Sequence, residues 1–215
     1  MILVPVKNLA TAKQRLAPVL DQPARTQLAQ AMLTDVLETI ATWKGRPAVS
    51  VVTSDPYALE LAQRYDFGVI RDAVNQSETA AIEMATKVCG AEFTLVVPGD
   101  IPLIQSEELR KIIDAVPEEG TVLVPSSDRR GTNAVFRRPA GLFPLRFGND
   151  SFRPHLSAAS ATGKPCIVLS LSGIALDVDT PDDLCQLASA PGDTRAQQLA
   201  RRWGFAAALP LAANQ

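Results

Sequence analysis

Two aspartates one residue apart, in the run from Gly173 to Pro181, carry the clearest chemical signal of this sequence. If residues 174–178 form a strand, Asp177 and Asp179 share one face while apolar side chains fill the other. Two carboxylates this close repel each other unless a cation or several donors lie between them. Hard oxygen ligands of this kind suit magnesium or manganese. The pair therefore predicts a site for a metal-held polyphosphate.

A third carboxylate, that of Asp100, would complete such a site. Residues 94–100 read as a short apolar strand of the kind found when helices cover both faces of a parallel sheet, and the acid falls at its end. Ligands of open α/β sheets bind outside the carboxyl ends of the strands. We therefore expect Asp100 to converge with Asp177 and Asp179 on one ligand.

Part of the same acidic run has a simpler explanation as a helix start. Asp179 or Thr180 can cap the helix that follows, with two further acids in its first turn. We assign those two acids, Asp182 and Asp183, to the helix start. Asp177 is kept for the site, because its neighbours are strand residues rather than turn residues.

Three cations, Lys7, Lys13 and Arg15, lie within nine residues directly after the first predicted strand. Doubly wound folds bind phosphates at this transition. Lysine and arginine there would neutralise a triphosphate, and arginine can bind it through two parallel hydrogen bonds. The loop lacks the glycines of a Walker or dinucleotide motif. By spacing alone, a solvated basic loop is an almost equal alternative.

A second polar cluster joins residues 131–133 to residues 146–152. Ser151 would cap a helix over residues 151–162, and the free amides of that helix start would seat a second anion beside Arg146. Capping alone explains Ser151 equally well. The only histidine, His155, lies on the same helix, where packing is the default interpretation and substrate contact the alternative.

Composition excludes several classes of protein. The chain has 215 residues, 47% of them hydrophobic, and 21 basic against 23 acidic side chains give a net charge of −2. With no basic stripe, nucleic acid is not an expected partner. No apolar stretch approaches membrane-spanning length and no signal-peptide core is apparent, so no membrane partner and a cytoplasmic location are expected. The three cysteines lack the close pairs of zinc sites.

Apolar runs alternate with helical periodicities along the chain, which predicts an α/β fold with a mostly parallel sheet in one domain, residues 1–215. The irregular residues 139–148 are where a substrate-specific insert would lie, and residues from 206 onward are expected to fray. The predicted strands are 2–6, 48–53, 68–70, 94–100, 121–125, 132–137, 166–171 and 174–178. The predicted helices are 23–43, 56–65, 78–89, one opening at 106, 151–162, 181–188 and 194–203.

Six segments, in this order and spacing, resemble the guanylyltransferases of coenzyme F420 biosynthesis, usually called 2-phospho-L-lactate guanylyltransferases, a family that includes phosphoenolpyruvate and 3-phosphoglycerate guanylyltransferases. The resemblance covers nearly the whole chain. It rests on PVKNLATAKQRL at 5–16, VVTSD at 51–55, VVPGDIPL at 96–103, GTNA at 131–134, RFGNDSF at 146–152 and LDVDTPDDL at 176–184.

The resemblance implies a three-layer α/β/α, Rossmann-like fold similar to nucleotide-diphospho-sugar transferases. It implies transfer of GMP from GTP to the phosphate of a three-carbon phospho-acid, with release of pyrophosphate. The implied ligands of a magnesium or manganese ion are Asp100, Asp177 and Asp179, with Lys13 as a fourth catalytic residue. Nucleotide binding is assigned to Lys7, Lys13, Arg15, Ser54, Asp55 and Asp100. Together with the polar cluster above, acceptor binding is assigned to Thr132, Asn133, Arg146, Gly148 and Ser151.

Several points stay open at this level. Residues 76–81 read QSETAA where the family is expected to have a Gly-Leu-Asn-Ala run, so contacts to the base or ribose are not assigned there. Two alternatives are a cytidylyltransferase of the same fold acting on a sugar or molybdenum-cofactor precursor, and a non-catalytic GTP-binding protein. The acceptor, the number of metal ions and a possible homodimer are undecided. The family implies hand-over of the product to the next transferase of the pathway.

Overall fold

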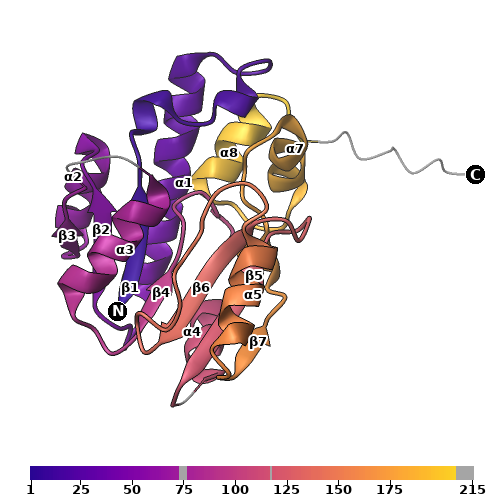
Figure 1. The fold of residues 1–215 in the computed structure, drawn as a ribbon. Coiled ribbons are helices and arrows are strands. Elements are labelled where there is room, and N and C mark those ends of the chain that lie inside the picture. The colour runs from indigo at the N-terminus through magenta and orange to yellow at the C-terminus, as the bar shows by residue number, and fades with distance from the viewer. Residues whose placement is uncertain (73–76, 117, 207–215) are drawn as a thin grey trace, which may run out of the picture.

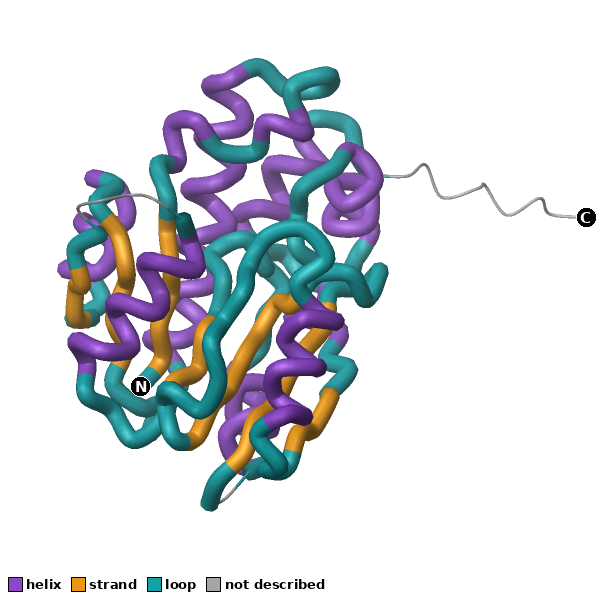
Figure 2. The backbone as a smooth tube through the Cα atoms, viewed as in Figure 1, coloured by secondary structure: helices purple, strands orange, loops and turns teal. Residues whose placement is uncertain are grey.

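One seven-stranded sheet forms the centre of the molecule, and helices cover both of its faces (Figure 2). The computed structural model describes residues 1–72, 77–116 and 118–206. The strand order is β3-β2-β1-β4-β6-β5-β7, and every pairing is parallel except the two made by β6. The strands are β1 Ile2–Val6, β2 Val49–Thr53, β3 Gly68–Ile70, β4 Thr94–Val96, β5 Gly120–Pro125, β6 Thr132–Arg138 and β7 Cys166–Val168. The predicted α/β class with a mostly parallel sheet is confirmed.

The alternation of side chains along the strands divides the core between two layers of helices. Ile2 and Val4 of β1 pack in the cluster on the side of α1, α2 and α4, while Leu3 packs on the side of α3 and α5 (Figure 1). The chain has eight α-helices in its described part. They are α1 Gln22–Thr42, α2 Pro56–Arg64, α3 Glu78–Cys89, α4 Ser106–Asp114, α5 Phe152–Ala161, α6 Ser172–Ala175, α7 Pro181–Ser189 and α8 Arg195–Arg202.

The ends of α1 show why these residues form a helix. The Asp21 side chain accepts a hydrogen bond from the Ala24 amide at 2.9 Å and so caps the helix. Helices α7 and α8 pack against α1 beyond one end of the sheet, where they form a second apolar cluster (Figure 1). None of the helices in the described ranges is long and apolar enough to cross a membrane.

One predicted strand is wrong. Residues 174–178 do not extend the sheet, because residues 172–175 form the short helix α6 and the chain then crosses the end of the sheet. The carbonyl of Ala175 accepts hydrogen bonds from the Ser127 amide and from the side chain of Asn133, which holds the helix in place. Val178 nonetheless donates to the carbonyl of Asp100. The acidic run therefore meets the segment after β4 through this backbone hydrogen bond rather than through a strand ladder.

Two other predicted strands are longer than those observed. Residues 94–100 contain the three-residue strand β4, and residues 166–171 contain the three-residue strand β7. After each strand the chain makes one more backbone hydrogen bond to the neighbouring strand, from the Val97 amide to the Leu3 carbonyl and from the Leu169 amide to the Leu123 carbonyl. It then leaves the sheet. Both departures turn the chain toward the carboxyl-end edge of the sheet. Residues 207–215, part of the stretch expected to fray, lie outside the described residues.

Candidate active site

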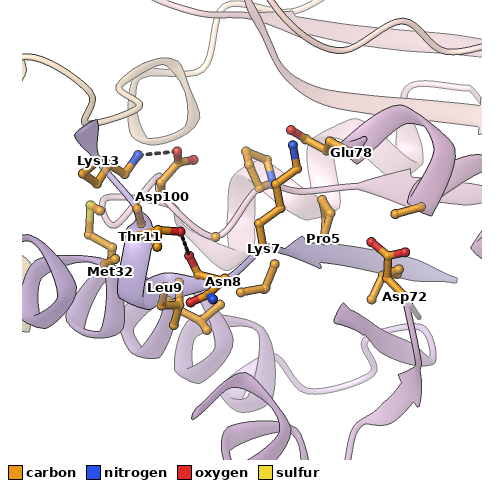
Figure 3. A pocket seen from close by; sticks show the side chains of 18 of the residues that line it. Pro5, Lys7, Asn8, Leu9, Thr11, Lys13, Met32, Asp72, Glu78 and Asp100 are labelled. Carbon is orange, nitrogen blue, oxygen red and sulfur yellow. Dashed lines mark hydrogen bonds and ion pairs between the residues drawn. The ribbon is translucent and has the colours of Figure 1, made fainter. Parts of the chain in front are cut away.

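A pocket of about 380 Å³ opens at the carboxyl ends of β1, β2 and β4 (Figure 3). Strand β1 has β2 on one side and β4 on the other, so the order of the sheet reverses at this point. Doubly wound sheets bind their ligands at such a reversal. The lining therefore combines the loop after β1 with the segment after β4 and the start of α3. The polar residues among it are Lys7, Asn8, Thr11, Lys13, Asp72, Glu78, Asp100 and Asp179.

Lys13 joins two of the predicted acids. Its Nζ lies 2.6 Å from Asp100 Oδ2 and 2.8 Å from Asp179 Oδ1, and its side chain is only 8% exposed. Burial alone would lower the pKa of the Lys13 ammonium, but the two carboxylates outweigh it and raise the pKa. Burial likewise opposes the charge of Asp179, and Lys13 lowers the pKa of that carboxyl below its usual range. One ammonium thus pairs with two carboxylates 79 positions apart in sequence.

The backbone of the basic loop aims Lys13 at the acids. Two short 3₁₀ helices, Leu9–Thr11 and Gln14–Leu16, flank Lys13, which adopts a left-handed conformation with φ of 56°. Residues other than glycine rarely adopt it, and such strain concentrates at functional sites. Asp55 supports the loop, because its Oδ2 accepts a hydrogen bond from the Leu9 amide at 2.9 Å.

Asp177 lies next to this pair and faces the second polar cluster. Its Oδ1 accepts a hydrogen bond of 3.0 Å from Asn133 Nδ2. Burial raises the pKa of the Asp177 carboxyl, the Asn133 bond opposes the rise, and the charges of Asp100 and Asp179 add to it. The third predicted acid therefore lies within electrostatic reach of the other two. In the part of the chain that the structure describes, however, no three side chains of the Asp, Glu, His or Cys type are grouped so as to hold a metal ion.

Thr132 and Ser151 form a buried network with His155. Ser151 Oγ accepts from the Thr132 amide at 3.0 Å instead of capping its own helix, so the predicted side-chain cap is wrong. The Arg146 amide donates to His155 Nε2 at 2.8 Å, and His155 Nδ1 lies 3.0 Å from Thr132 Oγ1. Because Nε2 accepts, we place the proton on Nδ1, which donates to Thr132. This network fixes residue 132 against the loop that carries residues 146–148.

The remaining predicted site residues lie at or beyond the rim of the pocket. The side chain of Arg15 is 70% exposed and approaches Asp179 at 3.7 Å. Arg146 and Gly148 are exposed on the loop before α5. Ser54 donates to the Asp72 carbonyl, and both carboxylate oxygens of Asp55 accept backbone amides. None of these five residues lines the cavity, although Lys7, Lys13, Asp100 and Asp179 do so together.

The acids at 182 and 183 behave as a helix start, as predicted. Asp183 Oδ2 accepts from the Thr180 amide at 2.7 Å, and the Thr180 side chain accepts from the Asp183 amide. Asp183 also accepts from the amide of Asp179. This capping box therefore holds the backbone of the residue whose side chain reaches Lys13.

Sequence reasoning missed Glu78, the first residue of α3. Its side chain projects into the same cavity, beside Lys7 (Figure 3). Burial, followed by the charge of Asp100, raises the pKa of this carboxyl to about 7. The signal that pointed here was the departure from the family pattern at residues 76–81, which marked the position without assigning it a role. Gln76 lies outside the described residues.

We predict that His155 makes the folded protein sensitive to acid. Burial, followed by Arg137, lowers the pKa of the imidazole from 6.5 to about 4. Between these values the unfolded chain binds a proton that the folded chain does not, so the stability due to His155 is lost as pH falls from 6.5 to 4. At 1.36 kcal/mol per pKa unit the loss is about 3 kcal/mol. Urea unfolding of His155→Gln across this window should show no such loss.

Glu78 also titrates in this pH range, so the effect of His155 on stability has to be measured as a difference between wild type and a variant. Its raised pKa means that the folded chain holds an extra proton between about 4.5 and 7, so its contribution to stability falls as pH rises through that range. The two groups therefore oppose each other in the wild type. The quantity to measure is the difference in free energy of unfolding between wild type and His155→Gln, and a difference that stays constant with pH would contradict the assignment.

The sheet order, the acids at its carboxyl edge and the lysine between them define a nucleotidyltransferase-like protein. By fold it is similar to a structure described as a nucleotide-diphospho-sugar transferase from Desulfovibrio desulfuricans G20, with a TM-score of 0.73 and 20% identity over 94% of this chain and 93% of that one. A cytidylyltransferase from Leptospira borgpetersenii has a TM-score of 0.61 at 14% identity, over 94% and 90% of the two chains. At these identities the likeness concerns the fold alone.

The family model for "Guanylyl transferase CofC like" matches residues 1–213. A phosphoenolpyruvate guanylyltransferase of Roseiflexus castenholzii is 34% identical over 94% of this chain and 93% of its own length. A 2-phospho-L-lactate guanylyltransferase of Methanothermobacter thermautotrophicus is 31% identical over 94% and 90%. The chain therefore belongs to the CofC-like guanylyltransferase family, and the expected membership is confirmed.

Proposed function

We propose that this protein transfers GMP from GTP to the phosphate of a three-carbon phospho-acid and releases pyrophosphate, as a step of coenzyme F420 biosynthesis. The observation that carries the proposal is the Asp100–Lys13–Asp179 arrangement at the strand-order reversal of a CofC-like guanylyltransferase. Relatives named for phosphoenolpyruvate and for 2-phospho-L-lactate limit the acceptor to acids of this kind. 3-Phospho-D-glycerate is the third candidate. A cytoplasmic location belongs to the same proposal.

The chemistry requires positioning and neutralisation of charge rather than a protein base. An acceptor phosphate, whose second pKa is about 6, is an anion at neutral pH and can attack the α-phosphorus directly. Its oxygen forms a new bond to that phosphorus, while the bond from phosphorus to the bridging oxygen breaks and pyrophosphate leaves. Two anions must meet and a third must depart, so cations around the phosphates lower the barrier. Lys7, Lys13 and Arg15 supply three of them.

A magnesium or manganese ion held by Asp100, Asp177 and Asp179 is part of the same proposal. Asp100 and Asp179 already share one cation, the Lys13 ammonium, and Asp177 adds carboxylate oxygen within electrostatic reach. Oxygen donors of this kind are what these ions prefer. Such an ion, when bound, would draw charge from the α-phosphate and from the departing pyrophosphate.

The acceptor is proposed to bind on the side of Asp177. Asn133 connects Asp177 to β6, and Thr132 and Ser151 hold the start of α5 against the same strand. The exposed Arg146 and Gly148 lie on the loop that His155 anchors. An acid that carries both a phosphate and a carboxylate would find the Arg146 guanidinium there, whereas the first amide of α5, that of Phe152, already donates to the Arg130 carbonyl. A homodimer and hand-over of the product to the next transferase extend this proposal.

A competition assay tests the proposed function. The purified protein is offered GTP, ATP, CTP and UTP, each with magnesium and with 2-phospho-L-lactate, phosphoenolpyruvate or 3-phospho-D-glycerate, and pyrophosphate release is followed. We expect release with GTP and one of the three acids, and little with the other nucleotides. A sugar phosphate is offered as a fourth acceptor, and release with CTP and this acceptor would identify a cytidylyltransferase instead. GTP binding without pyrophosphate release for any acceptor would identify a non-catalytic protein.

A further inference from the structure

The Glu78 carboxyl is a hydrogen-bond acceptor that has no donor among the residues that the structure describes. It begins α3, whose start is held by Ser77, since Ser77 Oγ accepts the Ala80 amide at 3.0 Å. The side chain projects into the pocket (Figure 3), and among the described residues no hydrogen bond or ion pair reaches its oxygens. The residue is half-buried, and polar groups that are shielded from water in proteins nearly always have a partner. An acceptor without a donor at the wall of a ligand pocket is suited to a hydrogen-bond donor on the ligand.

Glu78 lies on the wall of the pocket that α3 forms, within electrostatic reach of Lys13, Asp100 and Asp179. Those three side chains suit phosphates and a metal ion. Away from them the lining includes Val52 at the end of β2 and Ala81 of α3, two uncharged side chains that leave room for a flat base. A nucleotide with its phosphates at the charged end therefore brings its base toward α3.

Guanine presents donors that match a carboxylate. Its N1–H and N2–H groups point the same way, so the two oxygens of one carboxylate accept both in charge-assisted hydrogen bonds. Adenine and cytosine offer one amino donor beside a ring nitrogen that repels a carboxylate. Uracil offers one N–H between two carbonyls. A lone carboxylate at this wall consequently discriminates among the four bases.

We propose that the Glu78 carboxylate binds the N1–H and N2–H edge of guanine and so selects GTP as the nucleotide. The inference rests on the proposed guanylyltransferase function and names the residue that sets its base specificity. It places base recognition at Glu78, in the run where this chain departs from the expected family pattern. Because burial and the charge of Asp100 raise the pKa of this carboxyl to about 7, the carboxylate form that accepts both donors prevails above that pH.

The test compares nucleotides that differ only at the base edge. Inosine triphosphate lacks the N2 amino group, whereas 7-deaza-GTP is altered on the opposite side of the base and keeps N1–H and N2–H. Steady-state rates with each are measured for wild type, Glu78→Gln and Glu78→Ala, and affinities of the magnesium nucleotides are measured by titration calorimetry. Glu60→Gln makes the same change of charge at an exposed residue of α2 outside the pocket.

We expect wild type and Glu60→Gln to prefer GTP over inosine triphosphate by about 10- to 100-fold in kcat/KM, the worth of one hydrogen bond to a charged group. In both Glu78 variants this ratio should fall to about one, through a higher KM and a higher Kd for GTP with kcat largely kept. All proteins should treat 7-deaza-GTP like GTP. A merely structural role would weaken every nucleotide equally and leave the ratio unchanged.

Three outcomes overturn the inference. If both Glu78 variants keep the wild-type ratio of GTP to inosine triphosphate, Glu78 does not bind the base edge. If Asp72→Asn abolishes the preference and the Glu78 variants do not, the other carboxylate at this end is the one that binds guanine. If wild type itself does not use GTP, the proposed function fails first, and the assay shows this separately from any Glu78 result.

Discussion

Replacing Asp100 or Asp177 with asparagine is expected to lower kcat by about 10³-fold or more while the protein stays folded. Asn keeps the shape of the side chain and removes the negative charge that a metal ion or a phosphate-bound cation requires. Asp100 loses its ion pair with Lys13, although Lys13 keeps Asp179. Asp177 keeps an acceptor for Asn133 through the new amide oxygen. Pyrophosphate release and circular dichroism, measured together, check both halves of this prediction.

The matched control is Asp182→Asn, the same substitution on an exposed residue in the first turn of α7. It lies three positions from Asp179 and outside the pocket lining, so we expect wild-type turnover. Release at the wild-type rate by Asp100→Asn would remove Asp100 from the proposed metal site. An equal loss in all three variants would indicate a general electrostatic effect instead of specific ligands.

The edge of the sheet where the acids gather was predictable, whereas their local backbone was not. The apolar strand before Asp100 and the cations after β1 follow rules that hold throughout doubly wound folds. The strand assigned to residues 174–178 failed because alternation of apolar and acidic residues reports which side chains are buried, not which backbone conformation buries them. Ile174 and Val178 are buried as predicted, although one lies in a helix and the other beyond it.

Two features of the site depended on three-dimensional contacts that a linear pattern does not encode. The left-handed backbone at Lys13 points its ammonium between two acids, and nothing in the local sequence requires that conformation of a lysine. The buried imidazole at residue 155 was assigned by default to packing, yet it connects Thr132 to the backbone of Arg146. Hydrogen bonds of this kind join segments that are distant along the chain, so a local sequence pattern does not predict them.

Lys13→Met is expected to destabilise the protein in the absence of divalent cations, as well as to reduce turnover by about 10²-fold or more. The substitution keeps an unbranched side chain but leaves the carboxylates of Asp100 and Asp179 facing each other without a cation. Breaking a buried ion pair on one side costs about 3–5 kcal/mol. Because these acids are roughly one-third exposed, solvent screening reduces the expected loss to about 2–3 kcal/mol.

The pH dependence of this loss has a definite sign. In the wild type, Lys13 lowers the pKa of Asp179, so the stability due to that carboxylate is present above its unfolded pKa of 3.8 and is lost as pH falls through the lowered value. In Lys13→Met the two acids repel without a cation between them, so the pKa of Asp179 rises and a proton bound in the folded chain relieves the repulsion. Urea unfolding should therefore show the largest gap between variant and wild type near neutral pH and a smaller gap in acid.

Magnesium provides the decisive comparison, because an ion that binds these acids replaces the missing ammonium. We expect added magnesium to raise the Tm of Lys13→Met more than that of the wild type, where the ammonium already lies between the carboxylates. Lys7→Met is the matched control, since Lys7 lines the same pocket and its loss leaves the Lys13 ion pairs intact. An equal magnesium effect in all three proteins would mean that Asp100 and Asp179 hold the lysine but not the metal, and that the ion enters the site through the nucleotide alone.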